Sequence, residues 1–150
     1  MPYRFSDSKM IDIDQVLELY RCAEWSKDRT REEAELILAN SSLVLSAWDG
    51  NRLAGMARVL TDFVVRATLY DVIVRPEDQG KGVGRMLMEK FLDHPAMKRV
   101  PAIFLLTKDK RPFYEKFGFV STQERGLDAM IFIRDQSYPP TSCGEGKKGD

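Results

Sequence analysis

The sequence predicts a single α/β domain in which helices cover a mixed β-sheet. Short β-branched runs separated by turn signals occupy the first half of the chain, and a strand–helix–strand unit follows them. Apolar residues at helical spacing occur between these strands, so that helices and strands alternate. With 150 residues, the chain is long enough for one domain to bury most of its apolar surface.

The first third of the chain predicts one strand and two helices. Asp12 or Asp14 is suited to cap the first helix, and Thr30 with Glu33 forms a capping box for the second. Apolar residues recur at helical spacing behind both caps. The expected segments are a strand over 3–5, a helix that includes 16–20, a loop over 24–29 and a helix from 30 to about 38.

The centre of the chain predicts an antiparallel meander followed by a parallel crossover. Asp49-Gly50-Asn51 is a hairpin turn signal between two of the strands. A strand, a crossover helix and a further strand then form a unit that should be parallel and right-handed. The expected strands are 42–48, 52–60, 67–74, 102–107, 119–123 and 127–133, and the expected helices are 82–93 and 110–117.

The two ends of the chain differ in composition. Residues 1–135 contain the periodic segments and are expected to form the domain, whereas residues 136–150 have no periodicity and predict a disordered tail. Cys22 and Cys143 lie far apart and, with one histidine, predict neither a disulfide framework nor a metal site. Cys22 lies in a helical pattern, which favours a small core residue.

The charge balance argues against a polyanionic partner. The chain has 23 basic and 23 acidic side chains, so no global field attracts nucleic acid or an anionic membrane. There is no signal segment and no apolar run of membrane-spanning length, which makes the cytoplasm the expected compartment.

A glycine-spaced loop follows the apolar run that ends at Val74. Gly80, Gly82 and Gly84 leave the first N–H groups of the next helix open to an anion, and Lys81 and Arg85 add positive charge. The spacing matches neither a nucleotide P-loop nor a dinucleotide fingerprint. On these residues alone, the loop either holds a phosphate or only turns the chain tightly.

Two motifs together resemble one family. Gln79-x-x-Gly82-x-Gly84 is similar to the pyrophosphate-binding segment of the GCN5-related N-acetyltransferases (GNAT), and residues 113–119 (FYEKFGF) resemble their F-Y-x-x-x-G-F segment. The motifs occur in the family's order, and the resemblance covers roughly residues 3 to 134. It implies the acyl-CoA N-acyltransferase fold, a twisted mixed sheet whose fourth and fifth strands splay apart to admit the pantetheine arm of acetyl-coenzyme A.

The resemblance also implies which residues contact acetyl-CoA. Backbone groups near the end of the fourth strand would pair with the pantetheine, and an N–H near Val74 would polarise the thioester carbonyl. The segment before Phe113 lacks the asparagine and alanine of many members, which puts a contact there in doubt, although Arg111 could reach the phosphates. The expected contacts are Val72, Ile73, Val74, Gln79, Gly80, Lys81, Gly82, Val83, Gly84, Arg85, Arg111 and Phe113.

Two residues are candidates for catalysis. By resemblance, Tyr114 falls on the tyrosine that protonates the departing thiolate, a task for which a phenol with a pKa of about 10 is suited. The alternative is one more aromatic residue on an apolar helix face. Asp71 is the only carboxylate in the strand beside the expected thioester and is a candidate general base. It could equally be an outward-facing polar residue. A water chain could replace it, and Glu24 and Asp28 are other candidates for the base.

The predicted function is acetyl-CoA-dependent N-acetylation by direct attack in a ternary complex, because no nucleophilic Cys or Ser is evident. The sequence looks most like a small bacterial-type subgroup of the family, which is similar to the arylalkylamine and plastid-type serotonin acetyltransferases. This likeness favours a small primary amine, for instance an aromatic one, as acceptor. Glu24, Trp25 and Asp28 lie in the loop expected to line the acceptor pocket. The alternatives are acetylation of a protein N-terminus or lysine and a non-catalytic acyl-CoA sensor. Relatives often dimerise, so a homodimer is also an expectation.

Overall fold

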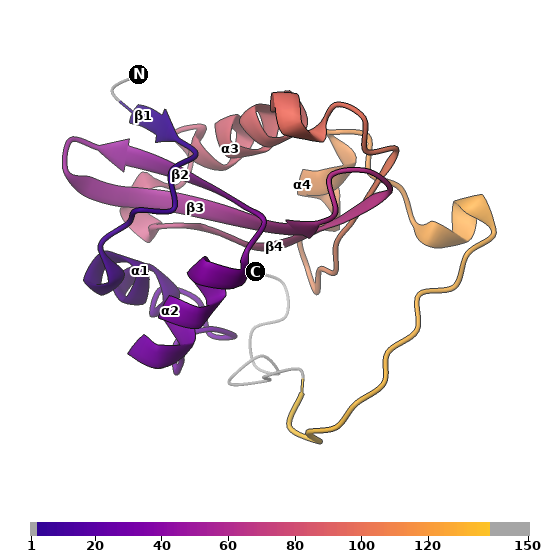
Figure 1. Ribbon diagram of the computed structural model, residues 1–150, viewed down its shortest axis with the longest axis horizontal. Helices are drawn as coiled ribbons and strands as arrows, with labels where there is room; N and C mark the ends of the chain where they lie inside the picture. Colours follow the sequence, from indigo (N-terminus) through magenta and orange to yellow (C-terminus); the bar gives the residue numbers. More distant parts are fainter. Residues whose placement is uncertain (1–2, 139–150) are drawn as a thin grey trace.

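The computed structural model describes residues 3–138 and shows a five-stranded sheet with helices on both faces (Figure 1). The strands lie in sequence order from β1 to β5. The pairs from β1 to β4 are antiparallel and β4 pairs with β5 in parallel, as the sequence predicts. The strands are β1 (Tyr3–Ser6), β2 (Leu43–Asp49), β3 (Arg52–Thr61), β4 (Arg66–Val74) and β5 (Ala102–Phe104).

Within residues 3–138, four α-helices and three short 3-10 helices accompany the sheet. The predicted caps are confirmed, since Asp12 caps the first helix and Thr30 with Glu33 forms a complete capping box on the second. The α-helices are α1 (Ile13–Tyr20), α2 (Arg31–Asn40), α3 (Val83–Leu92) and α4 (Arg111–Glu115). The 3-10 helices are η1 (Pro76–Asp78), η2 (Pro95–Met97) and η3 (Thr122–Arg125).

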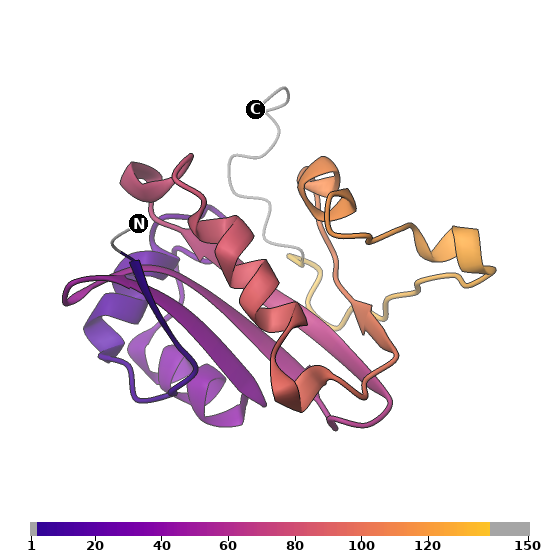
Figure 2. The ribbon, with the colours of Figure 1, turned by 90° about the horizontal axis from the view of Figure 1, so that it is seen from above.

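The helices divide the core into two layers. Figures 1 and 2 show α1 and α2 on one face of the sheet and α3 on the other. Val16, Leu19 and Tyr20 of α1 are fully buried on the first face, and Leu87, Met88 and Phe91 of α3 are fully buried on the second. Each helix thus buries one apolar stripe against the sheet.

Gly55 allows α3 to approach the sheet closely. A Cβ atom built at Gly55 would lie 3.0 Å from the carbonyl oxygen of Ile73, 3.1 Å from Val83 and 3.3 Å from Leu87. No larger residue fits there without movement of β4 or α3. This glycine therefore fixes the position of α3, whose first turn carries the predicted phosphate-binding loop.

The predictions for the C-terminal part are wrong in three places. Residues 119–123 and 127–133 form no strands, and β5 ends at Phe104 rather than at Thr107. Ser121 caps η3, and the amide of Leu127 donates to the carbonyl of Thr122 at 3.0 Å, so local hydrogen bonds close a turn where a strand was expected. The chain beyond this turn leads away from the sheet (Figures 1 and 2).

The structure also corrects the expectation for Cys22. This residue is exposed in the turn after α1, where its thiol lies 3.4 Å from the carbonyl oxygen of Glu18. The boundary at residue 135 stays a prediction, and the predicted tail and Cys143 lie mostly or entirely outside the described residues. Among residues 3–138, no helix is long and apolar enough to cross a membrane.

Candidate active site

The site is built around a gap at the edge of β4. The parallel ladder between β4 and β5 consists of Arg66–Ala102, Ala67–Ile103 and Thr68–Phe104 and goes no further. The second half of β4, from Leu69 to Val74, therefore has no hydrogen-bonding partner on that side among the described strands. The backbone there is available to an extended ligand. This is the splay that the sequence led us to expect between the fourth and fifth strands.

A β-bulge interrupts β4 in this unpaired half. The ladder with β3 pairs Arg58 with Tyr70 but Met56 with Ile73, so that Asp71 and Val72 together oppose Ala57. Asp71 has a φ of 55°, a left-handed conformation that is uncommon for a residue other than glycine. Bulges of this kind re-aim side chains and backbone groups, and here the bulge lies beside the gap.

Two arginines hold the Asp71 carboxylate at the bulge. Arg58 Nε donates to Asp71 Oδ2 at 2.6 Å, and Arg29 Nη1 donates to the same oxygen at 2.7 Å. The Tyr20 hydroxyl donates to it at 3.1 Å. Only 4% of the Asp71 side chain is exposed. Burial raises the pKa of this carboxyl, but the hydrogen bonds and charges of Arg29 and Arg58 outweigh it and lower the pKa below its ordinary value.

This cluster ties the predicted acceptor loop to the sheet. The Arg29 guanidinium lies 4.5 Å from the centre of the Tyr20 ring and 5.5 Å from that of Trp25. Trp25 is 40% exposed, Glu24 pairs with Lys27 at 3.0 Å, and Asp28 is exposed. The structure thus connects the predicted acceptor residue Trp25 to Asp71 through Arg29. Arg29 and Arg58 were missed from the sequence, because nothing in their neighbourhood marks the pairing.

The glycine loop leads from β4 into α3. Gly80 and Gly82 have φ values of 78° and 86°, and a Cβ atom at either position would meet nothing within 4 Å. Gly82 is the N-cap of α3 and supplies no side chain to its first N–H groups. Lys81 is exposed, and the Gln79 side-chain amide donates to the carbonyl of Val74 at 3.1 Å. The predicted loop residues therefore surround an open helix N-terminus that has positive charge beside it.

Gly84 is the point where β4, α3 and α4 meet. A Cβ atom built there would lie 3.5 Å from Phe113 Cζ and 3.7 Å from Val74 Cγ2. The end of the β4 gap, the start of α3 and the α4 motif thus come together, as their predicted roles require. Ile73 and Val83 are buried in the core, so only their backbone groups are available to a ligand.

Tyr114 lies on the inner side of α4, within an aromatic cluster. Its ring packs edge to face against Phe113 and Phe119, with centroids 5.0 and 5.9 Å away. Burial raises the pKa of Tyr114 to about 12, so the phenol stays protonated throughout the physiological range. Both readings of Tyr114 from the sequence, an acid and an aromatic packing residue, are compatible with this environment.

A cavity of about 370 Å³ lies between α3 and α4. Phe113 and Phe117 give it an aromatic wall, and Arg85 and Lys116 give it positive charge. Arg85 is held by Glu89 at 3.0 Å, and Arg111 by Glu115 at 2.9 Å. Glu89 also lines the cavity, so its lining carries one net positive charge beside the aromatic wall. Arg111 does not line it.

Comparison with known proteins identifies the class of protein. A family model described as the acetyltransferase (GNAT) domain matches residues 11–133. The chain is 30% identical to the uncharacterized N-acetyltransferase ycf52 of Porphyra purpurea over 132 residues, 85% of this chain and 75% of that protein. It is 28% identical to the chloroplastic GCN5-related N-acetyltransferase 1 of Arabidopsis thaliana, over 84% of this chain and 64% of that protein.

Solved structures agree with this result. A GNAT family acetyltransferase from Streptococcus pneumoniae superimposes with a TM-score of 0.75 and 27% identity, over 89% of this chain and 99% of that one. The chain therefore belongs to the GNAT family and is an acetyltransferase. Enzymes of this family generally use acetyl-CoA. The likeness to arylalkylamine acetyltransferases is a finer statement that these comparisons leave as a prediction.

Proposed function

We propose that the chain transfers the acetyl group of acetyl-CoA to a primary amine of a small molecule, by direct attack in a ternary complex. The observation that carries the proposal is the convergence at Gly84, where the unpaired half of β4 meets the open N-terminus of α3. An extended arm along β4 that ends in a phosphate at this helix fits both features. Such a ligand supplies the acetyl group as an activated thioester.

The binding roles follow from this arrangement. The backbone of Val72, Ile73 and Val74 pairs with the extended arm, and an N–H near Val74 polarises the thioester carbonyl. The loop from Gln79 to Arg85 binds the pyrophosphate through its backbone N–H groups, with charge from Lys81 and Arg85. Phe113 contacts the ligand from α4. The contact proposed for Arg111 has less support, since its guanidinium is held by Glu115.

Proton transfer is the second requirement of the reaction. Tyr114 is the proposed acid that donates to the departing thiolate, and its raised pKa keeps the donor proton in place. Asp71 is the candidate general base from the sequence, but the two guanidinium groups that lower its pKa make it a weak proton acceptor, so its proposed role is to position Arg29. Two guanidinium groups on one carboxylate leave a net positive charge at this point. This charge disfavours an ammonium group nearby and so helps to keep the acceptor amine neutral. Water can then accept the proton.

The acceptor is proposed from the loop between α1 and α2. Trp25 offers an exposed aromatic surface beside Arg29, which supports an aromatic amine such as an arylalkylamine. Glu24 and Asp28 are the acidic residues of the same loop and are proposed to contact the acceptor. We propose the cytoplasm as the compartment, although a relative of this chain is described as chloroplastic. No nucleic-acid or membrane partner is proposed for a chain of zero net charge.

Calorimetric titration of the purified protein with acetyl-CoA, and then with coenzyme A, tests the cofactor. We expect saturable binding of both ligands. The Gly82→Ala variant should bind acetyl-CoA about tenfold more weakly, a loss of about 1.4 kcal/mol, because a Cβ then stands where the anion approaches. A screen of amines, with arylalkylamines first and peptides with free N-termini or lysines second, then identifies the acceptor.

Gly50→Ala is the matched control for this experiment. Gly50 has a φ of 61°, and a Cβ atom there also meets nothing within 4 Å. Both substitutions therefore carry a similar backbone penalty of about 1–2 kcal/mol, but only Gly82 lies in the proposed phosphate loop. If both variants bind acetyl-CoA as the unmodified protein does, the loop is only a turn. No binding to the folded, unmodified protein would refute the proposed function.

A further inference from the structure

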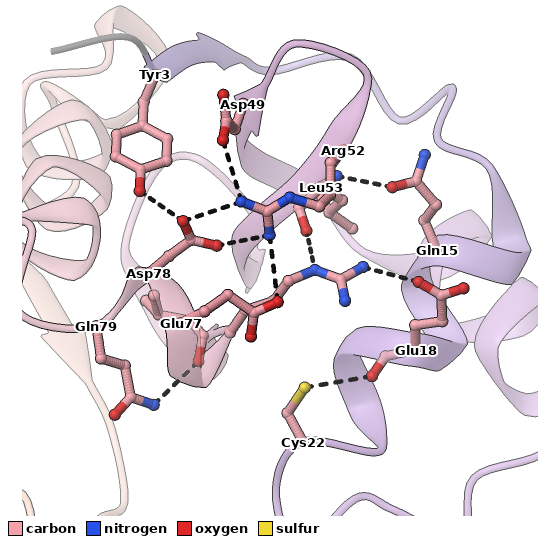
Figure 3. A network of polar contacts seen from close by, with 12 residues as sticks. Tyr3, Gln15, Glu18, Cys22, Asp49, Arg52, Leu53, Glu77, Asp78 and Gln79 are labelled. Atoms are coloured by element: carbon pink, nitrogen blue, oxygen red, sulfur yellow. Dashed lines mark hydrogen bonds and ion pairs between the residues drawn. The ribbon is translucent and has the colours of Figure 1, made fainter.

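A buried carboxylate lies immediately before the glycine loop. Asp78, the last residue of η1, is 1% exposed. The Tyr3 hydroxyl donates to Asp78 Oδ1 at 2.6 Å, Arg52 Nη1 donates to Oδ2 at 2.8 Å, and Arg52 Nη2 donates to Oδ1 at 3.1 Å (Figure 3). Three charge-assisted hydrogen bonds from β1 and β3 thus hold one side chain of the β4–α3 connection.

Hydrogen bonds between backbone groups fix the same turn to the sheet. The Arg75 amide donates to the carbonyl of Ala54 at 2.8 Å, and the Asp78 amide donates to the carbonyl of Arg75 at 2.9 Å. Gln79 follows directly, and its side-chain amide donates to the carbonyl of Val74. The chain is therefore held rigidly up to Asp78. The Gln79 amide donates to the carbonyl of Pro76 at 3.3 Å, and the next backbone hydrogen bond is that from the Met86 amide to the carbonyl of Gly82 at 3.0 Å, where α3 begins.

The loop itself contains little that could orient it. Gly80 and Gly82 have no side chains, and the side chain of Lys81 is exposed. Its direction must therefore be set at its two ends. Val83, which is 1% exposed, anchors the end in α3, and Asp78 is the corresponding anchor at the start. An apolar residue at position 78 could fill the same space but would not specify an orientation through directed hydrogen bonds.

Charge adds a second reason for this arrangement. An unpaired carboxylate one residue before the loop would repel a phosphate. Arg52 supplies the counter-charge to Asp78, but its guanidinium also pairs with Asp49 at 3.1 Å and lies 3.7 Å from Glu77, so three carboxylates share one positive charge. The Arg52 hydrogen bond is the main cause that lowers the pKa of Asp78, so the carboxylate stays ionised and bonded near neutral pH.

We propose that Asp78, held by Arg52 and Tyr3, is a positioning residue that sets the orientation of the pyrophosphate-binding loop. This inference rests on the proposed function of that loop. Asp78 does not touch the ligand; it fixes the direction in which the backbone N–H groups of residues 79–84 point. If these donors are displaced by even a small distance, they bind a phosphate less tightly.

The test compares three variants by acetyl-CoA binding and by hydrogen–deuterium exchange. Asp78→Asn keeps the shape of the side chain but removes its charge. Tyr3→Phe removes only one hydrogen-bond donor to Asp78, so this milder variant should still fold if Asp78→Asn does not. We expect Asp78→Asn to raise the acetyl-CoA Kd about tenfold and Tyr3→Phe to raise it less. Without ligand, exchange should accelerate at the hydrogen-bonded amides of Asp78 and Gln79, which hold the start of the loop, while β3 and α3 stay protected.

Asp49→Asn is the control, because Asp49 also pairs with Arg52 but its side chain is 47% exposed and it lies in β2. It should change neither measurement. Unchanged affinity and exchange in a folded Asp78→Asn protein would overturn the proposal. So would faster exchange throughout the chain with a proportional loss of affinity, since that indicates a structural role alone. If the unmodified protein binds no acetyl-CoA, the proposed function fails, but the exchange data still test whether Asp78 orders the loop.

Discussion

Tyr114 combines a polar group with an apolar setting in a way that packing alone does not require. Phe113 and Phe119 surround its ring, and a phenylalanine could fill the same place. We expect Tyr114→Phe to lower kcat about a hundredfold or more, the usual contribution of a positioned acid, while acetyl-CoA affinity stays nearly unchanged. Steady-state kinetics and calorimetry check the two effects separately, and an undiminished kcat would exclude the acid role.

The pH dependence of the reaction gives a second test of Tyr114. Burial raises its pKa to about 12, so the folded protein keeps the proton at pH values where an ordinary tyrosine begins to lose it. The acid role then predicts that kcat shows no loss from this group up to about pH 11. Because the folded pKa is raised, any stability that this proton contributes is lost as the pH rises through the folded value, not as it falls.

Asp71 offers a choice between proton transfer and positioning. Its pKa is lowered and two arginines hold it, so we expect Asp71→Asn to raise the KM for the amine, as Arg29 and the Trp25 loop lose their anchor. A general base would instead give a fall in kcat and remove an ionisation from the pH–rate profile. Arg29→Lys should share the KM effect if positioning is correct. A changed profile for Asp71→Asn alone would establish the base.

Gly55 and Gly84 differ in how well their surroundings would tolerate a side chain. At Gly55 a Cβ would lie 3.0 Å from a backbone oxygen, whereas at Gly84 the nearest atom is 3.5 Å away, an ordinary contact. We expect Gly55→Ala to cost about 1–3 kcal/mol of stability through overpacking. Gly84→Ala should be neutral or stabilise α3 by up to about 1 kcal/mol. Denaturant unfolding measures both, and equal effects would contradict the packing argument.

The sequence predicted an element correctly where the residues that determine it are close together in the chain. The caps at Asp12 and Thr30, the hairpin at Gly50 and the glycine loop are local signals, and the structure contains each of them. The strands expected over 119–123 and 127–133 do not form, because the Ser121 cap and the hydrogen bond from Leu127 to Thr122 close a local turn that the composition did not indicate. The Asp71 and Asp78 clusters join residues up to 75 positions apart, and no local pattern marks such pairs.

The failed strand prediction has a consequence for the assembled protein. Six of the seven residues in segment 127–133 are apolar, yet Met130 is 92%, Ile131 60% and Phe132 80% exposed. β5 lies at the edge of the sheet, and its outer side has no strand among the described residues. An exposed apolar segment and an open strand edge each favour association between copies, so the homodimer stays a prediction that can be tested.

We therefore expect the mass measured by sedimentation velocity to rise with protein concentration. A double variant, Ile131→Glu with Phe132→Glu, should remain monomeric, because the added charges oppose both burial and strand pairing. Leu36→Glu is the matched control, since Leu36 is 54% exposed on α2, away from that segment. Its association should equal that of the unmodified protein. A monomer at every concentration would mean that this segment stays exposed or folds back onto its own chain, and the homodimer would then lose its support.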